Sequence, residues 1–373
     1  MRINVRLFLF LTTFFLATNL IAKEYEANTS FSKKEKQRIG IIISSNHFKK
    51  PRITQKSLHD TVSLNHYLSQ LDPYSKYISA KEAAFKKKRG KARRLGIGLD
   101  LLIDGDLILG VPIKDGPAYQ AGITTPVYIC SINKKKIKST EFESYQFLAE
   151  FSQGQIVEIQ TMSKTAKKLG KYQVKVEWFV QKHVDIKPVG KVNVLSIRLF
   201  SNDSTLRIKK ALETLSQDKA LIIDLRFNPG GDLYATTDTL SFFIEQNLAV
   251  AYLKEKSIKN PLPLKTVSGR SISNKKVYLL LSQFTASSAE IFAQAIKHYL
   301  PQTVFIGSAT AGKCLAQETH LLKSKSAIQL SVYEVLNAQK EHCQNKPLIA
   351  DIKIKNIETM PLTQVISLLG RLN

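Results

Sequence analysis

The stretch VYLLLSQFTASSAEIFAQAIKHY, residues 277–299, decides the fold class of this protein. Its first five residues are apolar, as in a buried strand, and residues 288–299 are predicted to form a helix. A strand that leads into a helix is the repeating unit of an α/β domain with an internal sheet. The stretch therefore predicts an α/β domain.

The alternation of strands and helices continues on both sides of this stretch. Asp203 and Ser204 can cap a helix that extends to Leu215, and residues 236–245 are also predicted to be helical. The further predicted strands lie at residues 192–199, 220–225, 304–307 and 327–336. Together these patterns predict that the α/β domain spans residues 181–373.

Residues 91–180 have a different pattern. Short apolar runs at residues 99–103 and 107–111 flank Asp104-Gly105-Asp106, which is typical of a β-hairpin. More strand-like runs follow at residues 127–132, 156–161 and 172–180. This region is predicted to be a small β-rich domain.

Residues 23–90 are predicted to be mostly helical and to lead into a basic run. Seven of the nine residues from Lys86 to Arg94 are Lys or Arg. Such a run could bind phosphate groups. A solvated linker is the favoured interpretation, because no aromatic side chains interleave to stack on bases.

Residues 1–22 have the layout of a signal peptide. Arg2 and Arg6 give the segment a positively charged start, and an apolar run then extends from Leu7 to Ala17. Cleavage is expected after Ala22. The apolar run is shorter than the roughly 20 residues that a membrane-spanning helix needs. The sequence therefore predicts an exported protein of the periplasm or cell envelope.

The chain is strongly basic. Its 373 residues include 55 Lys and Arg against 30 Asp and Glu, a net charge of +25. This excess bears on partners and not on the fold, and it suits contact with an anionic surface. Because the chain has an export signal, envelope polyanions are favoured over nucleic acid as partners.

Several familiar sites are excluded because their motifs are absent. The sequence has no G-x-S-x-G elbow, no H-E-x-x-H and no G-x-x-x-x-G-K-[ST]. Its three cysteines are too few for a disulfide scaffold or for a zinc cluster built on C-x-x-C pairs.

Ser287 is the first candidate for chemistry. It lies at the predicted start of a helix, where free N–H groups and the helix dipole favour a developing negative charge. The ordinary alternative is helix capping, since Ser287-x-x-Glu290 also matches a capping box.

Lys313 and a pair of glycines strengthen this candidate. Lys313 follows the next predicted strand, and loops after neighbouring strands meet at one edge of an α/β sheet. It could act as the base for Ser287 if burial lowers its pKa, although most lysines lie on the surface. Gly230 and Gly231 follow a buried strand, where they could present N–H donors or simply form a turn.

In their order along the chain these segments resemble the serine–lysine C-terminal processing peptidases, also called tail-specific proteases. Leu71-Asp72-Pro73-Tyr74-Ser75-Lys76-Tyr77 resembles the motif before the family's PDZ domain, and Gly96-Ile97-Gly98 resembles the opening of that domain. The segments at residues 228–231, 285–287 and 310–313 then follow in the family's order.

This resemblance covers residues 60–355 and implies a fold. It implies an α/β (α+β) multidomain protein with a crotonase-like α/β peptidase core. An inserted β-rich PDZ-like domain would lie at residues 91–180, and a helical segment would precede it at residues 23–90.

The resemblance also implies roles for individual residues. Ser287 would be the nucleophile, Lys313 the general base, and Gln317 the residue that orients the lysine. The N–H groups of Ser288 and of Gly230 or Gly231 would bind the oxyanion. The implied reaction is peptide-bond hydrolysis through an acyl-enzyme, without a metal or cofactor.

Further residues match the family's motifs outside these roles. Glu290 and Thr310 occupy motif positions. The PDZ-like domain would hold the C-terminal carboxylate of a protein substrate on N–H groups near Gly96, Ile97 and Gly98, a mode that agrees with carboxylate capture in a backbone nest. An adaptor or activator protein is a further expected partner.

Two of the three cysteines could form a disulfide. Cys314 is adjacent to Lys313, and in an oxidising compartment a bond to Cys343 would pin the loop that carries the lysine. The alternative is two unpaired thiols, because the sequence does not give the separation of their Cα atoms. Cys130 lies in an apolar run and is interpreted as a core residue.

Three functions remain open at this point, and one of them is a basic protein that binds nucleic acid or an anionic surface. The favoured one is an exported serine endopeptidase that acts near the C-terminal tails of envelope or periplasmic proteins. The alternative is a catalytically inactive relative whose PDZ-like domain acts as a protein-binding scaffold.

Overall fold

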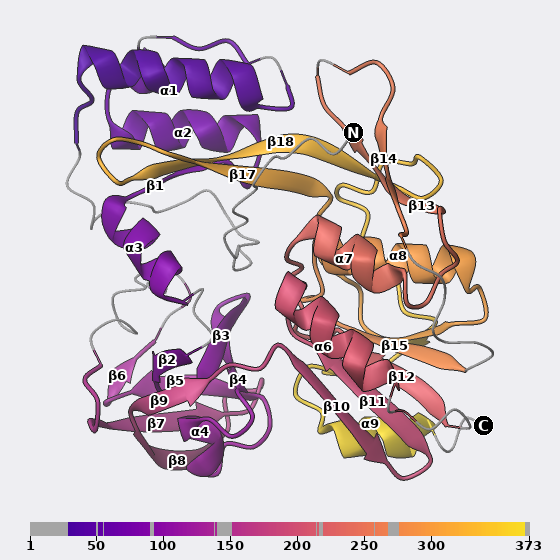
Figure 1. Ribbon diagram of the computed structural model, residues 1–373. Helices are drawn as coiled ribbons and strands as arrows, with labels where there is room; N and C mark the ends of the chain where they lie inside the picture. Colours follow the sequence, from indigo (N-terminus) through magenta and orange to yellow (C-terminus); the bar gives the residue numbers. More distant parts are fainter. Residues whose placement is uncertain are drawn as a thin grey trace.

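The structure of the protein is a computed structural model (Figure 1). It describes residues 29–49, 51–54, 56–89, 93–137, 139, 151–213, 215, 219–256, 258–267 and 276–369. The predicted signal peptide at residues 1–22 lies outside this part of the chain. Among the described helices, none has both the length and the apolar character that crossing a membrane requires.

A six-stranded central sheet organises the α/β part. Strand β10 is antiparallel to β11, and the remaining neighbours in the order β11-β12-β15-β16-β19 are parallel. The strands are β10 (Val184–Val189), β11 (Val192–Ile197), β12 (Ala220–Asp224), β15 (Val277–Leu281), β16 (Val304–Gly307) and β19 (Ile352–Lys353). The predicted α/β alternation is confirmed.

Helices cover both faces of the central sheet, so its inner strands β12 and β15 are almost fully buried and are apolar apart from Asp224. Along β12, Leu221 and Ile223 pack on one face and Ile222 packs on the other. The helices are α6 (Asn202–Glu213), α7 (Leu233–Leu240) and α8 (Ser288–Tyr299) on the first face and α9 (Leu362–Leu369) on the second. The loops after β12, β15 and β16 meet at one edge of this sheet.

An outer sheet joins the N-terminal segment to the α/β part. Its order is β1-β18-β13-β14, and β17 also pairs with β18. The strands are β1 (Lys76–Ile78), β13 (Ala249–Lys254), β14 (Leu262–Lys265), β17 (Leu315–Leu321) and β18 (Ala327–Asn337). Because β1 pairs with β18, with Lys76 opposite Gln329, residues 76–78 share a sheet with residues 327–329, which lie far from them in the sequence.

The N-terminal helices pack on this outer sheet, as Figure 1 shows for α1 and α2. Ile43 of α1 and Leu68 of α2 are fully buried in one cluster with Ile328 of β18. The elements are α1 (Lys33–Asn46), the 3-10 helix η1 (Lys56–Leu58), α2 (Thr61–Leu71) and α3 (Ala80–Arg89). The segment is therefore mostly helical, as predicted, but it adds a strand that was not predicted.

The β-rich domain, residues 93–180, has its own core, which includes Ile97, Ile129 and Ile159. Its main sheet runs β3-β4-β5-β7-β8 with β6 on β5, and β2 pairs with β9. Its elements are β2 (Arg93–Gly96), β3 (Leu99–Asp104), β4 (Leu107–Pro112), α4 (Pro117–Gln120), β5 (Val127–Ile132), β6 (Lys135–Lys136), β7 (Ile156–Met162), β8 (Lys168–Lys175) and β9 (Glu177–Val180).

The hairpin predicted around Asp104-Gly105-Asp106 is confirmed as β3 and β4. The run at residues 172–180 was predicted as one strand, and this is wrong. The run divides between β8 and β9, because Val176 leaves the ladder and exchanges backbone hydrogen bonds with Gly154 and Gln155.

Candidate active site

Ser287 lies in the turn between β15 and α8, and its backbone is in an unusual conformation. Its φ is 57° and its ψ is −126°, a region that L-residues other than glycine rarely adopt. Two bonds tie the turn to the loop after β12: Thr285 Oγ1 donates to Leu225 O at 2.8 Å, and Ala286 N donates to Asn228 O at 3.0 Å. Strain of this kind, which costs about 1–3 kcal/mol, is typical of functional sites.

The side chain of Glu290 joins the serine turn to the lysine loop. Its carboxylate is buried, with 1% of the residue exposed. Oε2 accepts from Ser287 N at 3.0 Å and from Lys313 N at 2.7 Å. Oε1 accepts from Thr310 Oγ1 at 2.5 Å and from Gly312 N at 2.7 Å. Burial raises the pKa of Glu290, and these four donors oppose that rise.

Lys313 is buried, and its environment favours the neutral amine. Burial lowers the pKa of Lys313 from 10.5 to about 8, against the carboxylates of Glu290 and Asp72, which raise it. The Nζ atom lies 4.5 Å from the centroid of the Tyr74 ring. A lysine in such a site can accept a proton near neutral pH, as a general base must.

Gly230 lies directly against the serine turn, and the next residue, Gly231, lies against the backbone of Phe200. Gly230 has φ 108°, and a Cβ atom built on it would lie 2.9 Å from Ser287 Cβ. The N–H of Gly230 donates to Asn228 Oδ1 at 2.8 Å. By contrast, the N–H groups of Gly231 and Ser288 donate no hydrogen bond within the described part of the chain.

These features come from a chain whose relatives are peptidases. Residues 191–354 match the sequence profile described as peptidase family S41. Residues 191–354 are therefore similar to a peptidase family S41 domain, and this region is called the S41 domain below. The serine turn, the lysine loop and both glycines lie within it.

Curated relatives support this assignment. The chain is 26% identical over 317 residues to a Staphylococcus aureus protein described as a CtpA-like serine protease, covering 84% of this chain and 63% of the relative. It is 27% identical over 290 residues to a Staphylococcus saprophyticus protein of the same description, covering 76% of this chain and 58% of the relative. The chain thus spans less than two thirds of the length of these relatives.

Solved structures share the fold. The photosystem II D1 C-terminal processing protease matches with a TM-score of 0.62 and 17% identity, covering 86% of this chain and 92% of the other. A Bacteroides fragilis protein described as an S41 protease matches with a TM-score of 0.61 and 16% identity, covering 90% and 97%. The S41 domain and the segments around it therefore have the mixed α/β fold of these proteins.

Gln317, on β17 of the S41 domain, lies near the lysine loop but bonds elsewhere. Its Nε2 donates to Leu315 O at 2.6 Å and to Ser331 Oγ at 3.4 Å. No hydrogen bond among the described residues joins it to Lys313. Its role in orienting the lysine stays a prediction.

Cys314 and Cys343 form a disulfide in the S41 domain, with their Cα atoms 5.6 Å apart. Both residues are buried. The loop that contains Cys343 also holds the lysine loop by backbone contacts, since Asn345 N donates to Gly312 O at 2.7 Å. Cys130 forms no disulfide, and it is half-buried in β5.

The predicted carboxylate-binding residues lie in the β-rich domain, at the turn from β2 to β3. Ile97 is buried, and its carbonyl accepts from Ala118 N at 2.9 Å. Gly98 has φ 69° and packs against Pro117. None of the contacts of Gly96, Ile97 or Gly98 within the described chain reaches Ser287 or Lys313, so the structure does not join the two predicted sites.

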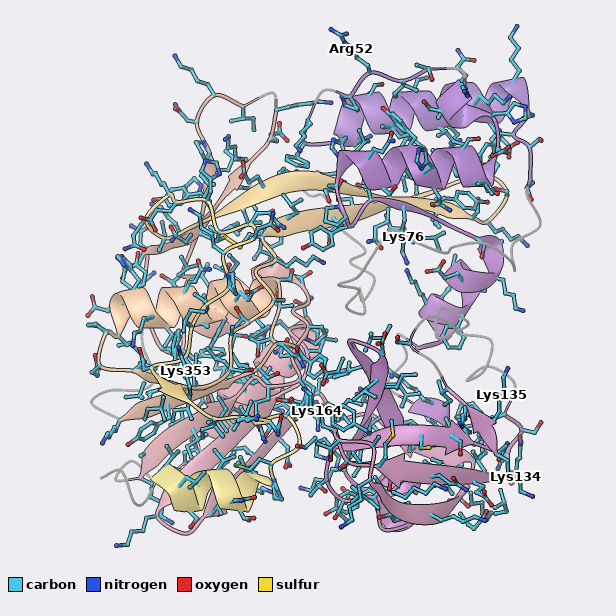
Figure 2. The ribbon with its side chains drawn as sticks, turned by 180° about the vertical axis from the view of Figure 1, so that it is seen from behind. Arg52, Lys76, Lys134, Lys135, Lys164 and Lys353 are labelled. Carbon is cyan, nitrogen blue, oxygen red and sulfur yellow. A yellow bond between two sulfur atoms is a disulfide. The ribbon has the colours of Figure 1, made fainter. Side chains whose placement is uncertain are left out.

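The β-rich domain does contact the serine turn by another route. Phe284 of that turn packs in one buried cluster with Leu109, Val111 and Tyr128 of the β-rich domain. A polar group lies beside this cluster. Lys164 Nζ, which Figure 2 labels where the two parts face each other, bonds Asp104 at 2.9 Å and Glu358 at 3.4 Å.

Sequence reasoning missed three neighbours of the site, namely Tyr74, Phe284 and Ser331. Tyr74 carried a signal, since it lies in the 71–77 motif, but no role followed from that motif. Among the described residues, no group of three or more His, Cys, Asp or Glu side chains could hold a metal ion.

Proposed function

We propose that this protein is an exported serine endopeptidase in which Ser287 is the nucleophile and Lys313 the general base. The observation that carries the proposal is the shared carboxylate of Glu290, which accepts from the backbone N–H groups of both residues. A neutral amine on the lysine is the second requirement, and the pKa of Lys313 supports it, because burial lowers this pKa to about 8 and so raises the neutral fraction near pH 7.

The proposed reaction proceeds in two steps. The neutral Nζ of Lys313 takes the proton of Ser287 Oγ, which attacks the peptide carbonyl carbon. The N–H groups of Ser288 and Gly231 bind the oxyanion, because Gly230 already donates to Asn228 Oδ1. The lysine then gives its proton to the departing amine, and water hydrolyses the acyl-enzyme by the same base.

The proposed substrates are C-terminal tails of envelope or periplasmic proteins. The β-rich domain would act as a PDZ-like module that holds the terminal carboxylate near Gly96, Ile97 and Gly98. The net charge of +25 supports contact with an anionic envelope surface. An adaptor or activator protein remains part of the proposal.

The test is cleavage of an unstructured protein by purified parent, Ser287→Ala and Lys313→Ala, with products identified by mass spectrometry. Lys209→Ala, which removes an exposed lysine on α6, is the matched control. We expect cleavage by the parent and the control and its loss in both site variants. Cleavage that survives Ser287→Ala would rule out the assigned nucleophile.

The same experiment separates the alternative function. A folded parent that cleaves nothing but binds peptides through their C-terminal carboxylates would be a protein-binding scaffold. Amidated peptides of the same sequence serve as the control for carboxylate recognition.

A further inference from the structure

We propose that Tyr74 is a positioning residue of the serine–lysine pair, whose ring covers the amine of Lys313 and keeps water away from it. This inference rests on the proposed function, because it concerns the same base. It gives a role to the 71–77 motif of the N-terminal segment. That segment would then form part of the active site.

The first observation is the position of the ring. Lys313 Nζ lies over the ring, 4.5 Å from its centroid. Within the described chain this amine has no hydrogen-bond or ion-pair partner, so its contact with the ring is not one of several polar bonds that hold it. Lys313 is only 8% exposed. The ring is thus one of the groups that separate the amine from solvent.

The second observation is how firmly Tyr74 is held. Its N–H donates to Asp72 Oδ1 at 2.8 Å, and its carbonyl accepts from Gln329 Nε2 at 3.0 Å. Its hydroxyl accepts from Gln344 Nε2 at 3.2 Å. Hydrogen bonds therefore fix both the backbone of Tyr74 and the hydroxyl at the end of its side chain.

The third observation links the tyrosine to the lysine loop. The amide of Gln344 donates to the Tyr74 hydroxyl and, through Oε1, accepts from Cys314 N at 2.7 Å. Cys314 follows Lys313 directly in the chain. Gln344 therefore bonds both the Tyr74 side chain and the backbone next to Lys313, and so holds the ring close to the lysine loop. A ring that only filled space would not need this bond.

The charges around the amine give the direction of the effect. The groups that face it are Glu290 from α8, Asp72 from the segment after α2, and Tyr74 itself. Both carboxylates raise the pKa of Lys313, and burial alone lowers it. Asp72 in turn is held by His47, Ser75 and Ser331. If water replaces the ring, hydration favours the ammonium form and the pKa rises.

The direct test is a titration of Lys313 by NMR in 13C-lysine-labelled full chain, with its resonance assigned by loss in Lys313→Ala. We expect the midpoint in Tyr74→Ala to lie about one unit above that of the parent, and that of Tyr74→Phe to stay within about 0.3 unit. Tyr67→Ala is the matched control, because Tyr67 lies on α2 and its hydroxyl donates to Arg52 O, with no side-chain bond to Lys313 among the described residues.

The activity readout uses the same variants. We expect kcat of Tyr74→Ala near pH 7 to fall about tenfold with little change in KM, and to recover at higher pH. If Tyr74→Ala does not fold, Tyr74→Gln replaces it. The glutamine side chain fills more of the ring's volume than alanine does, and its amide oxygen accepts from the ammonium form of Lys313.

Three results would overturn the inference: an unchanged Lys313 midpoint in Tyr74→Ala, an equal shift in Tyr74→Phe, or an equal shift in Tyr67→Ala. The NMR midpoint does not depend on cleavage. A parent that shows the expected midpoints but cleaves nothing would therefore contradict the proposed function and leave the placement of Tyr74 intact.

Discussion

The backbone N–H groups of Ser287 and Lys313 donate to the same oxygen atom, Oε2 of Glu290. The serine turn and the lysine loop follow different strands, β15 and β16, and this buried carboxylate joins them. The relative position of Ser287 and Lys313 therefore depends in part on this side chain, beside a backbone bond from Ala311 N to Thr285 O at 3.0 Å.

Glu290→Gln is expected to lower both stability and activity. An amide offers one acceptor oxygen in place of two, and its NH2 group would face N–H donors that now have a partner. Leaving buried donors unpaired costs about 1–3 kcal/mol each. We expect a lower thermal midpoint and a fall in kcat/KM of at least about tenfold.

Glu213→Gln is the control for this prediction, because Glu213 is exposed at the end of α6. It should behave as the parent. Equal activity in Glu290→Gln and the parent would show that the shared carboxylate does not set the geometry of the pair.

Gly230→Ala is expected to abolish most activity through a direct clash. The new Cβ would lie 2.9 Å from both Ser287 Cβ and Ala286 O, and φ at this position is 108°. Displacing Ser287 by about 1 Å would lower kcat by about a hundredfold.

Gly190→Ala separates the effect of the clash from the effect of the positive φ. Gly190 also has a positive φ, 58°, but nothing lies within 4 Å of its added Cβ. Each variant should lose about 1–2 kcal/mol from backbone strain, measured by urea unfolding. Only Gly230→Ala should lose kcat, and a matching loss in Gly190→Ala would contradict the clash.

The sequence predicts those parts of the site whose residues are close together in the chain. The β15–α8 stretch and the glycine pair are local patterns, so apolar runs and turn residues reveal them. The pairing of β1 with β18 is not local, because it joins residues 76–78 to residues 327–329. No periodicity reports such a contact, and the position of Tyr74 against Lys313 depends on it.

Strand β17 shows a second reason for failure. Residues 315–321 read LAQETHL, with a polar centre, and most of them are half-buried in the outer sheet. Without an apolar run or a clear alternation, pattern reasoning has nothing to detect. The position of Gln317 next to Ser331 therefore came only from the structure.

The depressed pKa of Lys313 predicts the pH dependence of both activity and stability. With the neutral amine as the proposed base, kcat/KM should rise with pH through a midpoint of about 8. Between about pH 8 and 10.5 the unfolded chain holds more protons than the folded one, so stability should rise with pH in this window.

The size of the stability effect follows from the same shift. Below about pH 8 the folded state carries the full cost of the buried ammonium, about 3 kcal/mol. Urea unfolding of the parent and of Lys313→Met across this range measures it. The slope that Lys313 contributes should vanish in Lys313→Met, and an identical slope in both proteins would mean that the lysine is hydrated when folded.

Reduction of the Cys314–Cys343 disulfide is expected to weaken the lysine loop. The bond closes a segment of 29 residues, for which chain entropy predicts about 3 kcal/mol of stabilisation. Cys314 N also donates to Gln344, and Cys314 follows Lys313 directly. A looser loop should therefore displace Lys313 and reduce kcat more than it changes KM. Thermal unfolding and kinetics with and without reductant measure both effects.

The double variant Cys314→Ser and Cys343→Ser should match the reduced parent and should not respond to reductant. Cys130→Ser is the control, because Cys130 is not bonded. A response to reductant that persists in the double variant would place the sensitive group elsewhere.

Phe284→Ala is expected to loosen the β-rich domain and the serine turn together. Phe284 is 2% exposed and packs with Leu109, Val111 and Tyr128, and truncating such a side chain costs about 3–5 kcal/mol. Phe242→Ala is the matched control, since Phe242 is buried in the core of the S41 domain and not against the β-rich domain. Limited proteolysis between residues 180 and 184, where the β-rich domain joins the central sheet, should be faster only in Phe284→Ala. Its kcat should also fall, because the turn that carries Ser287 loses one of its supports. If Phe242→Ala is cleaved at the same sites and rate, the effect is general destabilisation, and the contact between the two domains does not hold the serine turn.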